Sequence, residues 1–285
     1  MQQAEWADLA AAHHARVDQW IQPHLARRRA HQKHPVHDFL FTYYSHSPSA
    51  LRRWHPGFGV GLVDAASYSE VKGYVVRDGV AGVSAEYVEA QRPLIESINA
   101  LLIATASRAP SFGCLGLHEW AMVYQADETR HPVPLRLGAA GTDAVVETHT
   151  IKCSHFDAFR FFTPPAIPLN VLTPGRDDRV AFEQPGCLHA NMDLYKHAFR
   201  LSPMIPSSLV ADCFDLAWRI RDLDMQASPY ELTDFGYEPI CIETREGKVA
   251  YANAQRGFAG EGAELRARLI EECGRLTREV SPGTR

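Results

Sequence analysis

A polar stripe near the middle of the chain is the strongest candidate for chemistry. His189, Asp193 and His197 recur at every fourth position within 187–197. If this stretch is helical, as its apolar spacing indicates, the three side chains point roughly the same way, and two imidazoles with a carboxylate suit a divalent metal ion. The ends of such a stripe lie about 12 Å apart, so at most one pair should bind one ion. We favour His189 with Asp193; N-capping and core hydrogen bonding are the alternative.

A second candidate lies in an apolar, glycine-punctuated segment that contains His118, Glu119 and Trp120. A carboxyl group buried beside an aromatic ring is desolvated, so its pKa rises and it can act as a general acid or base near neutral pH. Glu119 is therefore a candidate catalytic residue. A salt bridge from Glu119 to Arg136 or Arg160 is the alternative.

A third candidate follows a segment rich in β-branched residues at 145–153, which predicts a strand. Extended geometry through this region would place His149, His155 and Asp157 on one face. A His-x-Asp pair can supply two ligands of a two-histidine, one-carboxylate site. Asp157 could equally be the N-cap of a helix through 159–162.

Aromatic and basic side chains offer possible binding surfaces for a planar or anionic ligand. Tyr43 lies in an aromatic block at 34–44, and Arg53 precedes Trp54. Trp120 could also stack on a flat ring. These side chains could instead form part of the core.

Composition limits the classes of protein to consider. The chain has 285 residues, is 46% hydrophobic and 22% charged, and has a formal net charge of −5. These values predict a globular protein with a sizeable core and no general attraction to nucleic acid. No apolar run approaches the roughly 18 residues of a membrane span, and the N-terminus does not resemble a secretory signal, so we expect a cytoplasmic protein with no membrane partner.

The six cysteines form no CxxC pair, which favours reduced thiols.

Hydrophobic periodicity predicts the elements that must position these residues. Helices are expected at 4–31, 37–54, 85–107, 188–200, 206–226 and 261–279 and around His118, a strand at 145–153, and a hairpin from 238–243 and 249–251. The glycine-rich segment 58–83 is expected to be irregular or extended, and 163–185 is proline-rich. The pattern indicates a mainly α chain with a small antiparallel β element, in one compact domain over 1–285.

Several longer strings resemble a bacterial family, common in actinobacteria, that is often labelled 3-methyladenine DNA glycosylase. The resemblance covers roughly 34–260 and rests on strings at 34–41, 51–58, 117–124, 155–164 and 184–196. It implies hydrolysis of an N-glycosidic bond in damaged DNA, although it assigns no catalytic residue. Such chemistry needs a flipped base, an aromatic stacking surface and a carboxylate near the sugar. Glu119, Asp157 and Asp193 are candidate carboxylates, with Tyr43, Trp54, Trp120 and Arg53 as candidate substrate contacts.

Two other hypotheses remain open. The chain could be a metal-dependent oxidoreductase or hydrolase that acts on a small molecule, with His118, His155 and His189 as candidate ligands of Fe, Zn or Mn. It could also be a binding protein whose histidines are structural. The sequence does not predict an oligomeric state.

Overall fold

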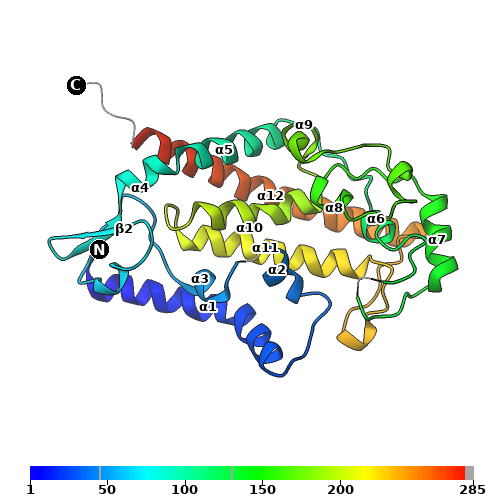
Figure 1. Ribbon diagram of the computed structural model, residues 1–285, viewed down its shortest axis with the longest axis horizontal. Helices are drawn as coiled ribbons and strands as arrows, with labels where there is room; N and C mark the ends of the chain where they lie inside the picture. Colours follow the sequence, from blue (N-terminus) through cyan, green and yellow to red (C-terminus); the bar gives the residue numbers. More distant parts are fainter. Residues whose placement is uncertain (45, 130, 280–285) are drawn as a thin grey trace.

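The computed structural model describes residues 1–44, 46–129 and 131–279, and the expected mainly α chain with a small antiparallel β element is confirmed (Figure 1). The helices are α1 (Gln3–Arg29), α2 (Asp38–Tyr43), α3 (Pro48–Arg52), α4 (Ala85–Ala90), α5 (Arg92–Ala106), α6 (Leu117–Ala121), α7 (Gly138–Thr148), α8 (Phe156–Phe159), α9 (Arg179–Phe182), α10 (Leu188–Leu201), α11 (Ser207–Gln226) and α12 (Arg245–Glu279). Short 3₁₀ turns lie at 66–68, 167–169, 176–178 and 233–235. In the described part of the chain, no helix is both long enough and apolar enough to cross a bilayer.

Three long helices form the centre of the molecule. Helices α10, α11 and α12 pack against one another along its long axis, and α5 lies against α12 (Figure 1). In α10, 11 of the 14 residues are buried. A surface helix would bury one apolar stripe only, so α10 carries its polar residues His189, Asp193 and His197 into the core.

The sheet lies at the end of the molecule near the N-terminus, away from α6 and α7 (Figure 1). Strands β1 (Leu62–Val63), β2 (Tyr74–Arg77) and β3 (Val80–Val83) form an antiparallel sheet in the order β1-β3-β2. This sheet occupies the glycine-rich segment that we expected to be irregular or extended. Trp54 packs here, in a small core cluster with Leu62 and Tyr68.

Two predicted β segments are wrong. Residues 138–148 form α7, and only Ile151 makes an isolated bridge, to Asn170. The side chains of Val145 and Val146 are buried against the main core, so packing outweighs their preference for strands. The expected face shared by His149, His155 and Asp157 therefore does not form.

The predicted hairpin near the C-terminus is also wrong, because α12 begins at Arg245. The string 245–248 reads as a turn because it contains Gly247. The structure gives that glycine another reason: an added Cβ would collide with the backbone of Cys241. The helix expected at 261–279 is thus the second half of a longer one, and the helix expected at 37–54 is divided into α2 and α3.

Candidate metal centre

Three buried side chains from three helices converge on one point. His118 comes from α6, His189 from the first turn of α10, and Asp224 from the last turn of α11. One potential ligand atom from each lies within 4.8 Å of the other two. The imidazole rings of His118 and His189 are 4.5 Å apart between centroids, and Nε2 of His118 is 3.0 Å from Oδ1 of Asp224. We call these three residues the triad.

The triad contains polar atoms that lack hydrogen bonds. Nε2 of His118 and Oδ1 of Asp224 are both buried, and neither has a hydrogen-bond partner among the described residues, although they lie at ion-pair distance. Buried polar groups are nearly always hydrogen-bonded. These two atoms face each other but do not have the geometry of a hydrogen bond. Two ligand atoms that bind the same metal ion would be arranged in this way.

The backbone before α6 explains how His118 reaches this point. Gly116 has φ +74°, a conformation that favours glycine, and an added Cβ would lie 3.3 Å from Ala227 and 3.4 Å from Tyr251. This close approach sets the start of α6 against the end of α11. Sγ of Cys114 then lies 3.3 Å from Nδ1 of His118, which leaves the other ring nitrogen to face Asp224.

The protonation of the triad suits a metal ligand set. Burial lowers the pKa of His189 to about 3, so its imidazole is neutral at pH 7. Burial alone would raise the pKa of Asp224, but His118 beside it holds that pKa well below its usual value, so Asp224 is ionised. Burial also acts to lower the pKa of His118, but the Asp224 carboxylate raises it above its ordinary range. A metal ion would therefore replace the proton of His118.

A second buried group adjoins the triad. Nε2 of His155 lies 3.4 Å from Oδ2 of Asp193 and 3.6 Å from Oε1 of Glu183, and these three residues also have atoms within 4.8 Å of one another. The ring of His155 is 5.3 Å from that of His189 between centroids. We call His155, Glu183 and Asp193 the second group.

Two cations neutralise the second group. Arg179 lies 2.5 Å from Glu183 and 2.7 Å from Asp193, and Nζ of Lys196 is 3.4 Å from Asp193. Burial acts to raise the pKa of Asp193, but His155 beside it and the cations Lys196 and Arg179 hold that pKa well below its usual value. Both carboxylates therefore already have cationic partners.

A small cavity of about 130 Å³ opens beside the triad. It is lined by Phe39, Tyr43, Glu119, Met122, His131, Asp157, Phe161, His189 and Arg221. Nη1 of Arg221 donates a 2.9 Å hydrogen bond to Oε1 of Glu119 and lies 3.4 Å from Oδ2 of Asp224. Arg221 thus connects the carboxylate in the cavity wall to the carboxylate of the triad.

The structure brings together some of the residues that the sequence singled out and separates others. His118 and His189 meet in the triad, whereas His155 and Asp193 belong to the second group. The favoured pairing of His189 with Asp193 is corrected, because the two residues contribute to different groups. His197 is buried but belongs to neither group.

The other candidate residues are also divided. Tyr43, Glu119 and Asp157 line the cavity. Glu119 pairs with Arg221 and not with Arg136 or Arg160. Asp157 lies in the first turn of α8, two positions after the N-cap residue His155, and pairs with Lys196 at 3.1 Å.

Three expected substrate contacts lie elsewhere or are enclosed. Trp120 is fully buried, and its indole nitrogen donates to the carbonyl of Ala227 at 2.8 Å, so no flat ligand can stack on it without rearrangement. Trp54 packs under the sheet, and Arg53 is exposed. None of these three residues lines the cavity beside the triad.

Sequence reasoning gave no role to Glu183 or Arg179, and it did not place Asp224 with the candidate histidine ligands. Glu183 lies near the end of the proline-rich segment 163–185, which has no periodic pattern, so no local signal marks it as buried. For Asp224 there was a signal: it stands among apolar residues of a predicted helix and could have been placed on the buried face.

The chain was compared with models of protein families, with curated proteins and with solved structures, and none of them matches it significantly.

Proposed function

We propose that this protein is a metal-dependent enzyme that holds one divalent ion at His118, His189 and Asp224. The observation that carries the proposal is the pair of buried atoms, Nε2 of His118 and Oδ1 of Asp224, that face each other without hydrogen bonds. A metal ion would satisfy both atoms at once. Two imidazoles and one carboxylate are a common catalytic donor set, because they leave coordination positions open.

The triad is a better primary site than the second group because of charge. Arg179 and Lys196 already compensate Glu183 and Asp193, so an ion there would have to displace two cations. Breaking such buried pairs costs several kcal/mol, of order 3–5. In the triad, the one arginine or lysine near Asp224 among the described residues is Arg221 at 3.4 Å, and it lies closer to Glu119 at 2.9 Å. A metal ion there would displace only the proton of His118. We therefore expect one tightly bound ion per chain.

The donor set is compatible with Fe, Zn or Mn. When bound, such an ion would polarise a substrate oxygen or a water molecule. The chain's own residues would then act from the cavity wall. Glu119 would accept a proton, and Arg221 would hold its carboxylate in position through the 2.9 Å hydrogen bond. Metal-assisted hydrolysis of a small molecule is the reaction class that this arrangement favours.

Elemental analysis of untagged protein tests the proposal. Asp224→Asn keeps the size of the side chain and removes its charge. Asp222→Asn is a matched control, because Asp222 lies on the same helix and pairs with His37 at 2.7 Å, outside the triad. We expect about one Fe, Zn or Mn per wild-type chain, retained in D222N and lost in D224N with the helical circular dichroism unchanged.

Two results would overturn this proposal. One is a folded wild-type protein that neither contains a metal nor takes one up during titration with these three ions. The other is equal loss of metal from D222N and D224N, which would show that the triad is not the site.

A second candidate function is hydrolysis of an N-glycosidic bond in damaged DNA, as the family resemblance implies. The observation that favours it is that Tyr43, Glu119 and Asp157 line one cavity, which supplies an aromatic ring and two carboxylates. Release of 3-methyladenine from alkylated DNA tests it. Metal-independent release that falls in Glu119→Gln or Asp157→Asn would support glycosylase chemistry over the metal-dependent reaction.

A further inference from the structure

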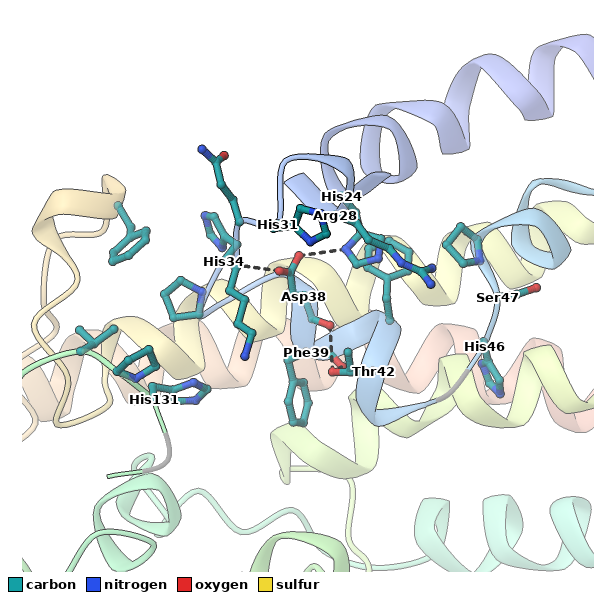
Figure 2. Close-up of a pocket in the computed structure, with 18 residues that line it drawn as sticks. His24, Arg28, His31, His34, Asp38, Phe39, Thr42, His46, Ser47 and His131 are labelled. Atoms are coloured by element: carbon teal, nitrogen blue, oxygen red, sulfur yellow. Dashed lines mark hydrogen bonds and ion pairs between the residues drawn. The ribbon is translucent and has the colours of Figure 1, made fainter. Parts of the chain in front are cut away.

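A large groove opens next to the cavity beside the triad. Its volume is about 970 Å³, and it lies between the C-terminal end of α1, the loop that leads to α2, α2 itself, and the segment at 131–133 (Figure 2). The cavity of about 130 Å³ is too small for a typical substrate, since ligand pockets usually measure about 300–1,000 Å³. The groove is large enough to hold the part of a substrate that does not fit in the cavity.

The groove and the cavity share two wall residues. Phe39 and His131 line both. In Figure 2 the ring of Phe39 points away from Asp38, on the side of the groove where His131 lies. A molecule seated in the groove would therefore pass these two side chains to reach His189 and Glu119, which line the cavity.

The charge of the groove selects for anions. Arg28 and Lys33 line it, both are exposed, and neither has a carboxylate partner within the described ranges. Asp38 is the one carboxylate among the described lining residues, and it is already engaged by His24, by Arg27 and by the backbone N–H of His34. The two cations are thus uncompensated.

The groove also contains flat apolar surfaces. Phe235 is 40% exposed and lies edge-on to His34, with 5.7 Å between ring centroids. Burial lowers the pKa of His34 and of His46 to about 4, so both imidazoles are neutral at pH 7 and act as flat hydrogen-bonding groups. Aromatic faces with nearby cations recognise ligands that combine a ring with negative charge.

We infer that the groove binds the substrate of the proposed enzyme, a small molecule that joins a flat ring to an anionic group. This inference rests on the proposed function for the role of the triad. Arg28 and Lys33 hold the anionic group, the aromatic side chains contact the ring, and the reacting end extends past Phe39 into the cavity.

Binding of 1-naphthyl phosphate to the full-length protein, measured by calorimetry at constant salt, tests this assignment. The double variant Arg28→Ala/Lys33→Ala removes both groove cations. Arg29→Ala/Arg77→Ala is the matched control, because it removes two exposed cations that lie outside the groove. Its net charge is therefore the same as that of the first double variant. We expect binding at least about tenfold weaker in the first variant, a loss of about 1.4 kcal/mol or more, and unchanged in the second.

Comparison of ligands tests the other half of the inference. Inorganic phosphate lacks the ring and 1-naphthol lacks the charge, so each should bind more weakly than 1-naphthyl phosphate. Equal loss of binding in both double variants, equal binding of phosphate alone, or no binding of the naphthyl phosphate would overturn the assignment.

A second measurement separates this inference from the proposed function. If the groove is the entrance to the triad, saturating 1-naphthyl phosphate should slow the removal of the metal by a chelator. An unchanged rate with bound ligand would overturn the route past Phe39. Ligand binding by a protein that takes up none of the three metal ions would leave the groove assigned and the metal-dependent function rejected.

Discussion

The triad and the second group contain similar side chains and differ in what surrounds them. Both are buried, and both combine histidine with carboxylate. In each group a histidine Nε2 lacks a hydrogen bond, but in the triad the facing carboxylate oxygen, Oδ1 of Asp224, lacks one too. In the second group, Arg179 and Lys196 engage the carboxylates. Residue type alone therefore does not define a metal site: the charge already present decides whether another cation is attracted. Three predictions test this difference and a fourth provides a reference, and they run from the largest expected effect to the smallest.

The largest effect is expected when the second group loses its principal cation. Arg179→Met should destabilise the metal-free protein by about 3–5 kcal/mol, because Glu183 and Asp193 would remain buried with one cation fewer. Urea unfolding measures this change. Added Zn²⁺ or Mn²⁺ should restore part of the stability and raise the number of bound ions above one per chain. A variant of normal stability would show that Arg179 does not neutralise the group.

The next prediction compares the loss of metal affinity when one carboxylate of each group is neutralised. Asp224→Asn should weaken metal binding by at least about 100-fold, because it removes a charged ligand, whereas Asp193→Asn should weaken it by about tenfold or less, as expected for a neighbouring position. Competition with a metal-binding dye gives both affinities. If Asp193→Asn has the larger effect, the ion is held by the second group.

His55 is a buried histidine that belongs to neither group and has no carboxylate partner among the described residues. It therefore shows what burial without a carboxylate partner does to the pKa of an imidazole. Burial lowers the pKa of His55 to about 3, and its Nδ1 lies 3.1 Å from the hydroxyl of Tyr74. Below pH 6.5 the unfolded chain binds a proton at this histidine that the folded chain excludes, so stability falls as the pH decreases.

When the pH is lowered from 7 to 5, His55 should decrease the free energy of unfolding by about 2 kcal/mol. His55→Gln should reduce the loss of stability over this range by that amount, measured by urea unfolding at each pH. An unchanged pH dependence would indicate that His55 is solvated or partnered in the folded protein.

The smallest effect is expected at the histidine of the second group. His155→Gln should weaken metal binding by about tenfold, because His155 lies beside His189 without belonging to the triad. The same dye competition measures it. Complete loss of the metal would place His155 among the ligands and make the two groups one site.

The sequence predicted much of the helical framework, and the reasons are local. The apolar periodicity of α10 and α11 is strong, and their predicted ranges agree closely with the structure. The helix expected at 85–107 is divided into α4 and α5. The segment at 145–153 was mistaken for a strand because β-branched residues can also pack on a buried helix face. Gly247 was mistaken for a turn residue because the nearby backbone of Cys241 cannot be seen in the sequence.

The candidate site was predicted in part. Burial of His118, His155 and His189 followed from their apolar neighbours. Their division into two groups did not, since it depends on how α6 and α11 meet α10. The role of Glu183 was hidden for the same reason: its partners Arg179 and Asp193 are brought to it by tertiary packing, and no spacing in the sequence records that contact.

One turn of α10 fixes the distance between the triad and the second group. His189 belongs to the triad and Asp193 to the second group, so their separation along the axis is four residues, or about 6 Å. Loops could lengthen or shorten elsewhere without altering this spacing. Insertion of a single residue between them would rotate one group by about 100° relative to the other, so the register of this one turn is the dimension of the site least tolerant of change.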